Sequence, residues 1–129
     1  MAVEEIPDPD ILFMRIHRAW FPQGVLNTAA FRNMPTPADG MSTDWNKYSS
    51  ARETRRRSHT SPPTDYAVVQ LEVGEVRKLP DQSVVHSPIA ENHAHTEVFG
   101  NKKLPEVRVK LGRLAERDGY VYRVDDPDE

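Results

Sequence analysis

The chain has 129 residues, which is the size of one domain with a single hydrophobic core. Hydrophobic residues make up 37% of it, and the absence of any apolar run of about 18 residues excludes a membrane-spanning helix. The absence of cysteine excludes a disulfide framework, a thiolate zinc site and a cysteine nucleophile. The first residues are acidic and contain no apolar segment, so we expect no secretory signal and a cytoplasmic protein.

The net charge of −3 conceals a separation of charge along the chain. Residues 1–10 and 125–129 each carry four acids and no base, which leaves twelve acids against seventeen bases in residues 11–124. We therefore predict a single α+β domain over 11–124, flanked by an acidic N-terminal tail and an acidic C-terminal tail. Such tails are commonly solvated ends. Alternatively, they compete with an anion or an acidic partner for the basic body.

The first predicted element is a strand over residues 11–17, because five of its seven residues are apolar. Under the two-residue period of a strand, Arg15 and His17 share a face with Ile11 and Phe13. Trp20-Phe21-Pro22 ends this segment.

A short helix is predicted next, over residues 44–56. Ser42 or Thr43 would be its N-cap, and the spacing of Trp45 and Tyr48 would turn an aromatic stripe toward the core.

Two further strands are predicted from alternation and β-branched residues. Residues 66–73 alternate in their second half, Gly74 would form a bulge, and residues 120–124 form the last strand. Short strands are also predicted at residues 84–86 and 96–99.

Residues 104–116 fit two patterns. Leu104, Val107, Leu111 and Leu114 follow helical spacing, whereas the alternation of residues 107–111 would suit a strand. We favour the helix. The predicted fold is therefore α+β, a mostly antiparallel sheet with one or two helices and long loops.

Three segments carry a resemblance: residues 27–31 (NTAAF), 40–44 (GMSTD) and 93–103 (HAHTEVFGNKK). Together they resemble an uncharacterised group of small bacterial proteins, which share a Met/Leu-Ser-x-Asp step and a later Ala-His-x-x-Val-x-Gly-Lys-Lys motif. Here Asn101 separates the glycine from the first lysine. The resemblance implies a bacterial or phage-related origin and no named activity.

The histidines are the first candidates for chemistry. His93 and His95 would share one face of a strand and, with His86, are weak candidates for metal ligands, although we expect no metal and no cofactor. His95 is the candidate general base of a metal-independent enzyme that acts on RNA or a nucleotide. Lys102 and Arg15 would bind the phosphate in such an enzyme.

A second arrangement consists of Arg15, the pair Ser42-Thr43 and Glu53. It resembles ADP-ribosyltransferases, in which an arginine and a serine hold the dinucleotide and a glutamate activates the ribose. That family carries its glutamate at a strand, whereas Glu53 falls in a predicted helix, and Glu97 is the alternative.

Basic residues form two clusters in the sequence. If both lie on one face, they form a stripe suited to nucleic-acid phosphates, with Trp45 and Tyr48 available for stacking. The candidate nucleic-acid-binding residues are Arg52, Arg55, Arg56, Arg57, Lys102, Lys103 and Arg113.

No glycine-rich phosphate loop and no Gly-x-Ser-x-Gly motif occurs. The leading hypothesis is a small intracellular adaptor or accessory protein that binds a protein partner through Trp20, Phe21 and Phe31. Whether the protein is an enzyme stays open, and we favour the interpretation that it is not. The alternative is a nucleic-acid-binding protein or the metal-independent enzyme centred on His95. A membrane partner is not expected.

Overall fold

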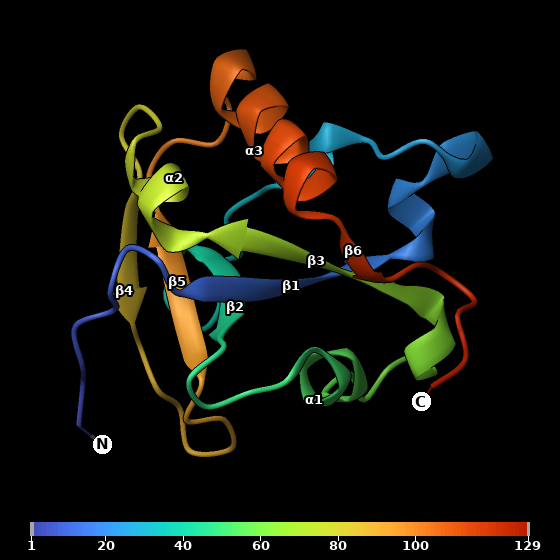
Figure 1. The fold of residues 1–129 in the computed structure, drawn as a ribbon, viewed down its shortest axis with the longest axis horizontal. Helices are drawn as coiled ribbons and strands as arrows, with labels where there is room; N and C mark the ends of the chain where they lie inside the picture. Colours follow the sequence, from blue (N-terminus) through green and yellow to red (C-terminus); the bar gives the residue numbers. More distant parts are fainter. Residues whose placement is uncertain (1, 129) are drawn as a thin grey trace.

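The computed structural model describes residues 2–128. Six strands form one antiparallel sheet in the order β4-β5-β2-β1-β3-β6, and three helices pack against it (Figure 1). The strands are β1 Ile11–His17, β2 Met41–Trp45, β3 Tyr66–Glu72, β4 Ser83–His86, β5 His95–Phe99 and β6 Tyr120–Tyr122. The helices are α1 Ala51–Arg56, α2 Val73–Arg77 and α3 Pro105–Asp118. The predicted α+β class with a mostly antiparallel sheet is confirmed.

The two faces of β1 have different roles. Leu12, Met14 and Ile16 are buried and belong to the hydrophobic core, whereas the alternate residues are only partly buried. Helix α3 contributes to the core, while α1 lies on the other side of β1 and β3 (Figure 1). Consequently Arg15 and His17 point away from the core, as the two-residue period predicts.

Helix α3 confirms the favoured interpretation of the C-terminal part. Val107, Leu111 and Leu114 are buried against the sheet, and Pro105 occupies the first turn, where its missing N–H costs no hydrogen bond. The helix ends before Gly119, whose φ of 85° lies in the left-handed region. Helical spacing of apolar residues was therefore the correct signal here.

The helix predicted over residues 44–56 is wrong in its first half. Residues Met41–Trp45 form β2, and helix α1 begins only at Ala51. Its N-cap is Ser50, which forms a capping box with Glu53. The period-two alternation of Met41 to Trp45 places Trp45 in the core and was the signal that the helical spacing obscured.

The bulge predicted at Gly74 is also wrong, because the chain leaves β3 there and forms helix α2. The backbone carbonyl of Asp8 accepts a hydrogen bond from the N–H of Gly74 at 2.8 Å, and a Cβ on Gly74 would lie 3.0 Å from the Cβ of Asp8. The close approach of the N-terminal segment therefore explains the glycine. Among residues 2–128, no helix has the length and apolar character that crossing a bilayer requires.

Residues of both acidic ends make contacts with the body. Ile6 is buried in the core, Asp8 forms an ion pair with Arg77 at 2.7 Å, and Asp10 accepts from the indole N–H of Trp45 at 2.8 Å. Near the other end, Asp125 and Asp128 form ion pairs with arginines of the body. The side chains of Asp8 and Asp125 are 71% and 72% exposed, so the ends are anchored while these carboxylates stay in contact with solvent.

Candidate functional site

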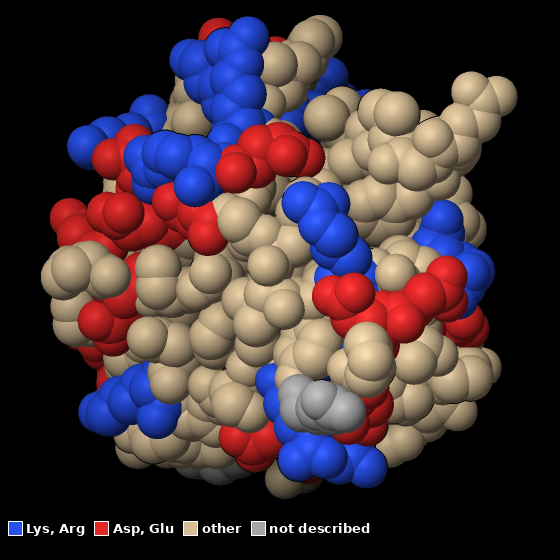
Figure 2. Space-filling view, turned by 45° about the vertical axis from the view of Figure 1, so that its right-hand side comes forward, with Lys and Arg blue, Asp and Glu red and all other residues tan. Residues whose placement is uncertain are grey.

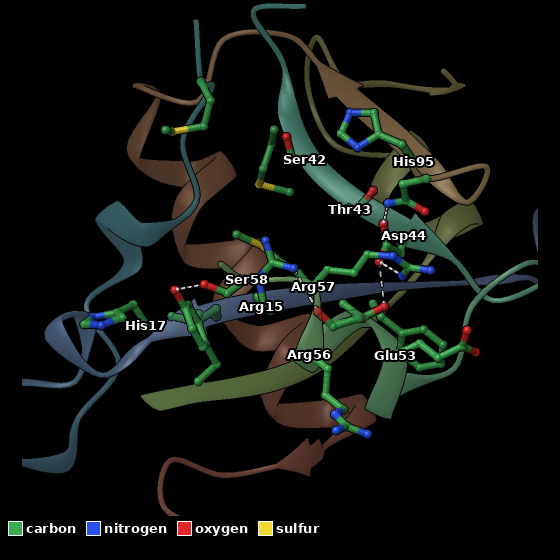
Figure 3. Close-up of a pocket in the computed structure, with 18 of the residues that line it drawn as sticks. Arg15, His17, Ser42, Thr43, Asp44, Glu53, Arg56, Arg57, Ser58 and His95 are labelled. Carbon is green, nitrogen blue, oxygen red and sulfur yellow. Dashed lines mark hydrogen bonds and ion pairs between the residues drawn. The ribbon is translucent and has the colours of Figure 1, made fainter. Parts of the chain in front are cut away.

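A cleft with a volume of about 1200 Å³ is bordered by β1, β2, α1 and the start of β5 (Figure 3). This volume is sufficient for a nucleotide, since small-molecule sites commonly measure about 300–1,000 Å³. Seven arginine or histidine side chains line the cleft, against three carboxylates. These seven are Arg15, His17, Arg32, Arg56, Arg57, His59 and His95. The four arginines exceed the three carboxylates by one formal charge, which favours an anionic ligand.

Arg15 projects from β1 into the cleft. Its Nη1 donates to the carbonyl oxygen of Thr54 at 2.8 Å, and its Cζ lies 5.6 Å from the centre of the Tyr66 ring. Burial lowers the pKa of Arg15, an effect that Asp44 partly offsets. Its other N–H groups have no hydrogen-bond partner among residues 2–128, so donors remain for a ligand.

Arg57, just after α1, is held in place by buried Asp44. One Asp44 oxygen accepts from Arg57 at 2.6 Å and from the Thr54 hydroxyl at 2.7 Å, and the other accepts from Asn92 at 2.8 Å. Arg57 also donates to the hydroxyl of Ser49 at 2.7 Å. The second cation of the cleft is therefore pre-positioned by a hydrogen-bond network.

His95 and Glu97 form a buried pair on β5. The Nε2 of His95 lies 3.1 Å from Oε2 of Glu97, whose side chain is fully buried. Within residues 2–128, the second carboxylate oxygen of Glu97 has no hydrogen-bond partner. Because His95 lines the cleft and Glu97 does not, the carboxylate orients the imidazole from behind.

Lys102 does not belong to this site, which corrects its predicted roles in catalysis and nucleic-acid binding. It is 2% exposed, and its Nζ donates to Asn33 Oδ1 at 2.9 Å and to the carbonyl oxygens of Val98 and Gly100 at 2.9 and 3.0 Å. Burial lowers its pKa to about 8. Through these hydrogen bonds, the buried ammonium group of Lys102 stabilises the loop that follows β5.

The three predicted partner anchors have different environments. Phe31 is completely buried in the core, so no surface remains for a partner, and that prediction is corrected. Trp20 is partly buried at the cleft, with Arg32 positioned 5.0 Å from its ring centre. Phe21 is partly buried beside Tyr120 in a separate cavity of about 460 Å³.

The histidines do not form a metal site in the described part of the chain. Nδ1 of His86 accepts from the backbone N–H of Glu4 at 3.0 Å, and its Nε2 is 2.8 Å from the carbonyl oxygen of His93. Both ring nitrogens are therefore engaged, with the proton on Nε2. In residues 2–128, no three histidine or carboxylate side chains come together as ligands.

The two basic clusters do not form one stripe. Arg55 is fully buried, which corrects its predicted contact with nucleic acid, and Arg52 and Arg56 lie on α1. Lys103 and Arg113 belong to α3 and the segment before it, on the opposite side of the sheet (Figure 1). On the face shown in Figure 2, basic side chains are interspersed with acidic ones. Trp45, in the core, is not available for stacking.

The arrangement that resembles ADP-ribosyltransferases is brought together only in part. Arg15 and Ser42 lie on neighbouring strands and line the same cleft, whereas the Thr43 hydroxyl donates within the sheet to the carbonyl oxygen of Thr96 at 3.1 Å. The carboxylate of Glu53 lines the cleft but also caps α1. Glu97, directly opposite Ser42 in the sheet, is the glutamate carried on a strand.

Sequence reasoning missed two parts of the site. The Asp44 network depends on β2, whose strand alternation was obscured by an apparent helix spacing. The pairing of His95 with Glu97 follows from their two-residue separation on one strand, a signal that the sequence did contain. The chain matches no protein-family model, no curated protein and no solved structure, so the cleft is interpreted from its own geometry.

Proposed function

We propose that the cleft binds a nucleotide through its phosphate groups, and that the protein acts on this nucleotide with His95 as the acid–base group. One observation carries the proposal. The cleft combines Arg15, with unused donors, Arg57, fixed by Asp44, and an imidazole supported by a buried carboxylate. Phosphate recognition and proton transfer thus have their residues in one cavity.

Each residue has a distinct role in this proposal. The planar guanidinium of Arg15 would donate two parallel hydrogen bonds to a phosphate, and Arg57 would add a second fixed positive charge. His95 would take a proton from the attacking hydroxyl or water, because imidazole exchanges protons near neutral pH. Glu97 would stabilise the imidazolium that forms.

The nucleotide to test first is a dinucleotide such as NAD. The part of the resemblance to ADP-ribosyltransferases that supports this choice is the pair Arg15 and Ser42, which border the same cleft, whereas Glu97, opposite Ser42, does not line it. A mononucleotide such as AMP provides the comparison that isolates phosphate binding from recognition of the second nucleoside.

Calorimetric titration with AMP, NAD and inorganic phosphate tests binding. The variant Arg15→Gln should weaken nucleotide affinity roughly 10- to 100-fold, since hydrogen bonds to charged groups contribute about 1.5–3 kcal/mol. Arg113→Gln is the matched control, because it removes the same charge from exposed α3 on the other side of the sheet. Equal affinity in both variants would reject the cleft as the binding site.

The leading sequence hypothesis, action through a protein partner, stays a prediction. Its remaining anchors are Trp20 and Phe21, which are both partly buried. Trp20 borders the cleft itself, so a partner seated there would compete with the nucleotide.

A further inference from the structure

We infer that the substrate is a nucleic-acid strand: its end nucleotide occupies the cleft, and Arg52 and Arg56 bind the phosphate backbone that continues outside. We also infer that Asp128 covers these two arginines in the free protein. The inference rests on the proposed function, because it requires the cleft to hold a nucleotide.

The basic side chains continue outward from the cleft along α1. Arg56 lines the cleft and extends away from the centre, where Arg15 and Arg57 lie (Figure 3). Arg52 precedes Arg56 by four residues, so the two side chains are neighbours on one face of the helix. Both are about half exposed, with side-chain exposures of 51% and 53%.

This continuation indicates a ligand longer than one nucleotide. The phosphate of a mononucleotide would bind at Arg15 and Arg57, which leaves Arg52 without a role in the complex. A strand places a phosphate at every nucleotide, and cations along its path bind it without regard to sequence. The site therefore favours an end of a strand over a free nucleotide.

Asp128 already occupies this outer position. One of its carboxylate oxygens is 3.2 Å from Nε of Arg56, and the other is 3.9 Å from Nε of Arg52. The Asp128 side chain is 25% exposed, but both arginines are about half exposed, and ion pairs at such solvent-exposed cations are weak. A phosphate of the incoming strand is therefore able to displace the Asp128 carboxylate and bind Arg52 and Arg56.

The segment that carries Asp128 is tethered to the body at Arg123, Asp125 and Pro127. Buried Arg55 donates to the carbonyl oxygens of Arg123 and Pro127 at 3.1 and 3.3 Å. Arg18 pairs with Asp125 at 2.6 Å. Because the tether holds the carboxylate at a high local concentration, Asp128 acts as an internal competitor for phosphate.

The test compares a fluorescently labelled single-stranded tetranucleotide with AMP, using anisotropy for direct binding and for competition. The unaltered protein should bind the tetranucleotide at least about tenfold more tightly than AMP, with a steeper dependence on salt. The variant Arg52→Gln should reduce the tetranucleotide affinity toward that of AMP. AMP affinity itself should not change, because Arg52 does not line the cleft.

Asp128→Asn tests the competitor. The substitution should raise tetranucleotide affinity about three- to tenfold, because it releases Arg52 and Arg56 to bind the phosphates outside the cleft. AMP affinity should stay unchanged. Glu75→Gln is the matched control, since it also removes one negative charge from an ion pair at the surface, between Glu75 on α2 and Lys78 just after it. Thermal unfolding of both variants verifies that they are folded.

Three results have separate meanings. A tetranucleotide no tighter than AMP overturns the strand as substrate while the nucleotide cleft stands. Equal effects of Asp128→Asn and Glu75→Gln overturn the competitor. Absence of AMP binding, with or without tetranucleotide binding at Arg52 and Arg56, overturns the proposed function.

Discussion

At the scale of single residues, the buried pair of His95 and Glu97 is the feature with the clearest chemical consequence. A carboxylate behind an imidazole fixes the orientation of the ring and stabilises its protonated form. Because Glu97 is fully buried and His95 borders the cleft, only the histidine meets a ligand. The two residues should therefore affect turnover in different ways.

His95→Gln should lower the turnover of a bound nucleotide by about 100-fold or more, the usual range for a lost acid–base group, with little change in binding. Glu97→Gln should reduce turnover less, because the ring stays at the cleft but loses the carboxylate that fixes its orientation. Turnover measured at saturating nucleotide tests this. His59→Gln, another histidine at the cleft, is the control, and an unchanged turnover in Glu97→Gln would contradict the role of the carboxylate.

The burial of Lys102 predicts how the free energy of unfolding changes with pH. Burial lowers its pKa from 10.5 to about 8, so between these values the unfolded chain holds more protons than the folded protein. The free energy of unfolding contributed by this group therefore rises with pH from 8 toward 10.5. We expect the difference in unfolding free energy between the unaltered protein and Lys102→Met, measured with urea, to widen from pH 8 to 10.5. Lys103→Met, on the exposed neighbour, should show no such trend, and a constant difference for Lys102→Met would refute the assignment.

At the scale of elements, the N-terminal segment is part of the fold because His86 holds it. The imidazole accepts from the N–H of Glu4 and donates to the carbonyl of His93, so it links residues that are far apart in sequence. Glu4 also interacts through its side chain with Lys47 and the hydroxyl of Tyr48. The segment is thereby fixed against the end of β4.

The variants His86→Gln and His86→Phe separate hydrogen bonding from packing. Phenylalanine leaves the N–H of Glu4 and the carbonyl of His93 unpaired, which should cost about 1–3 kcal/mol of unfolding free energy for each group that stays buried. Glutamine supplies one acceptor and one donor and should cost less. Chemical unfolding followed by Trp45 fluorescence reports on this region, because the two rings are in contact. Equal losses in the two variants would show that packing alone matters.

Elements also show where sequence patterns succeed and fail. Helix α3 was predicted because its helical spacing of apolar residues extends from Leu104 to Leu114, whereas the competing alternation is confined to residues 107–111. The segment Met41–Trp45 was mistaken for the start of a helix because Trp45 and Tyr48 are three residues apart, and they do contact each other, at 5.5 Å between ring centres. That contact arises at the end of a strand and not within a helix. Short elements of five or six residues are decided by such tertiary contacts.

At the scale of the whole molecule, the order of the strands assembles the cleft. Strand β2 lies between β1 and β5, so Arg15, Ser42 and His95 meet although they are distant in sequence. Periodicity predicted the face on which Arg15 lies, but it contains no information about which strands are neighbours. Strand order depends on non-local pairing, and that is why the individual candidates could be predicted while their assembly could not.

The strict alternation along β1 has a consequence for how this sequence can change over time. From Leu12 to His17, buried core residues alternate with partly buried residues on the face that carries Arg15. Loss of one codon within β1 would exchange the two sets and send Arg15 toward the packed interior and Met14 out of it. Substitutions can alter the core and the cleft separately, but an insertion or deletion in this strand changes both at once. We therefore expect the length of β1 to stay constant during evolution, even where the residues on its cleft face change.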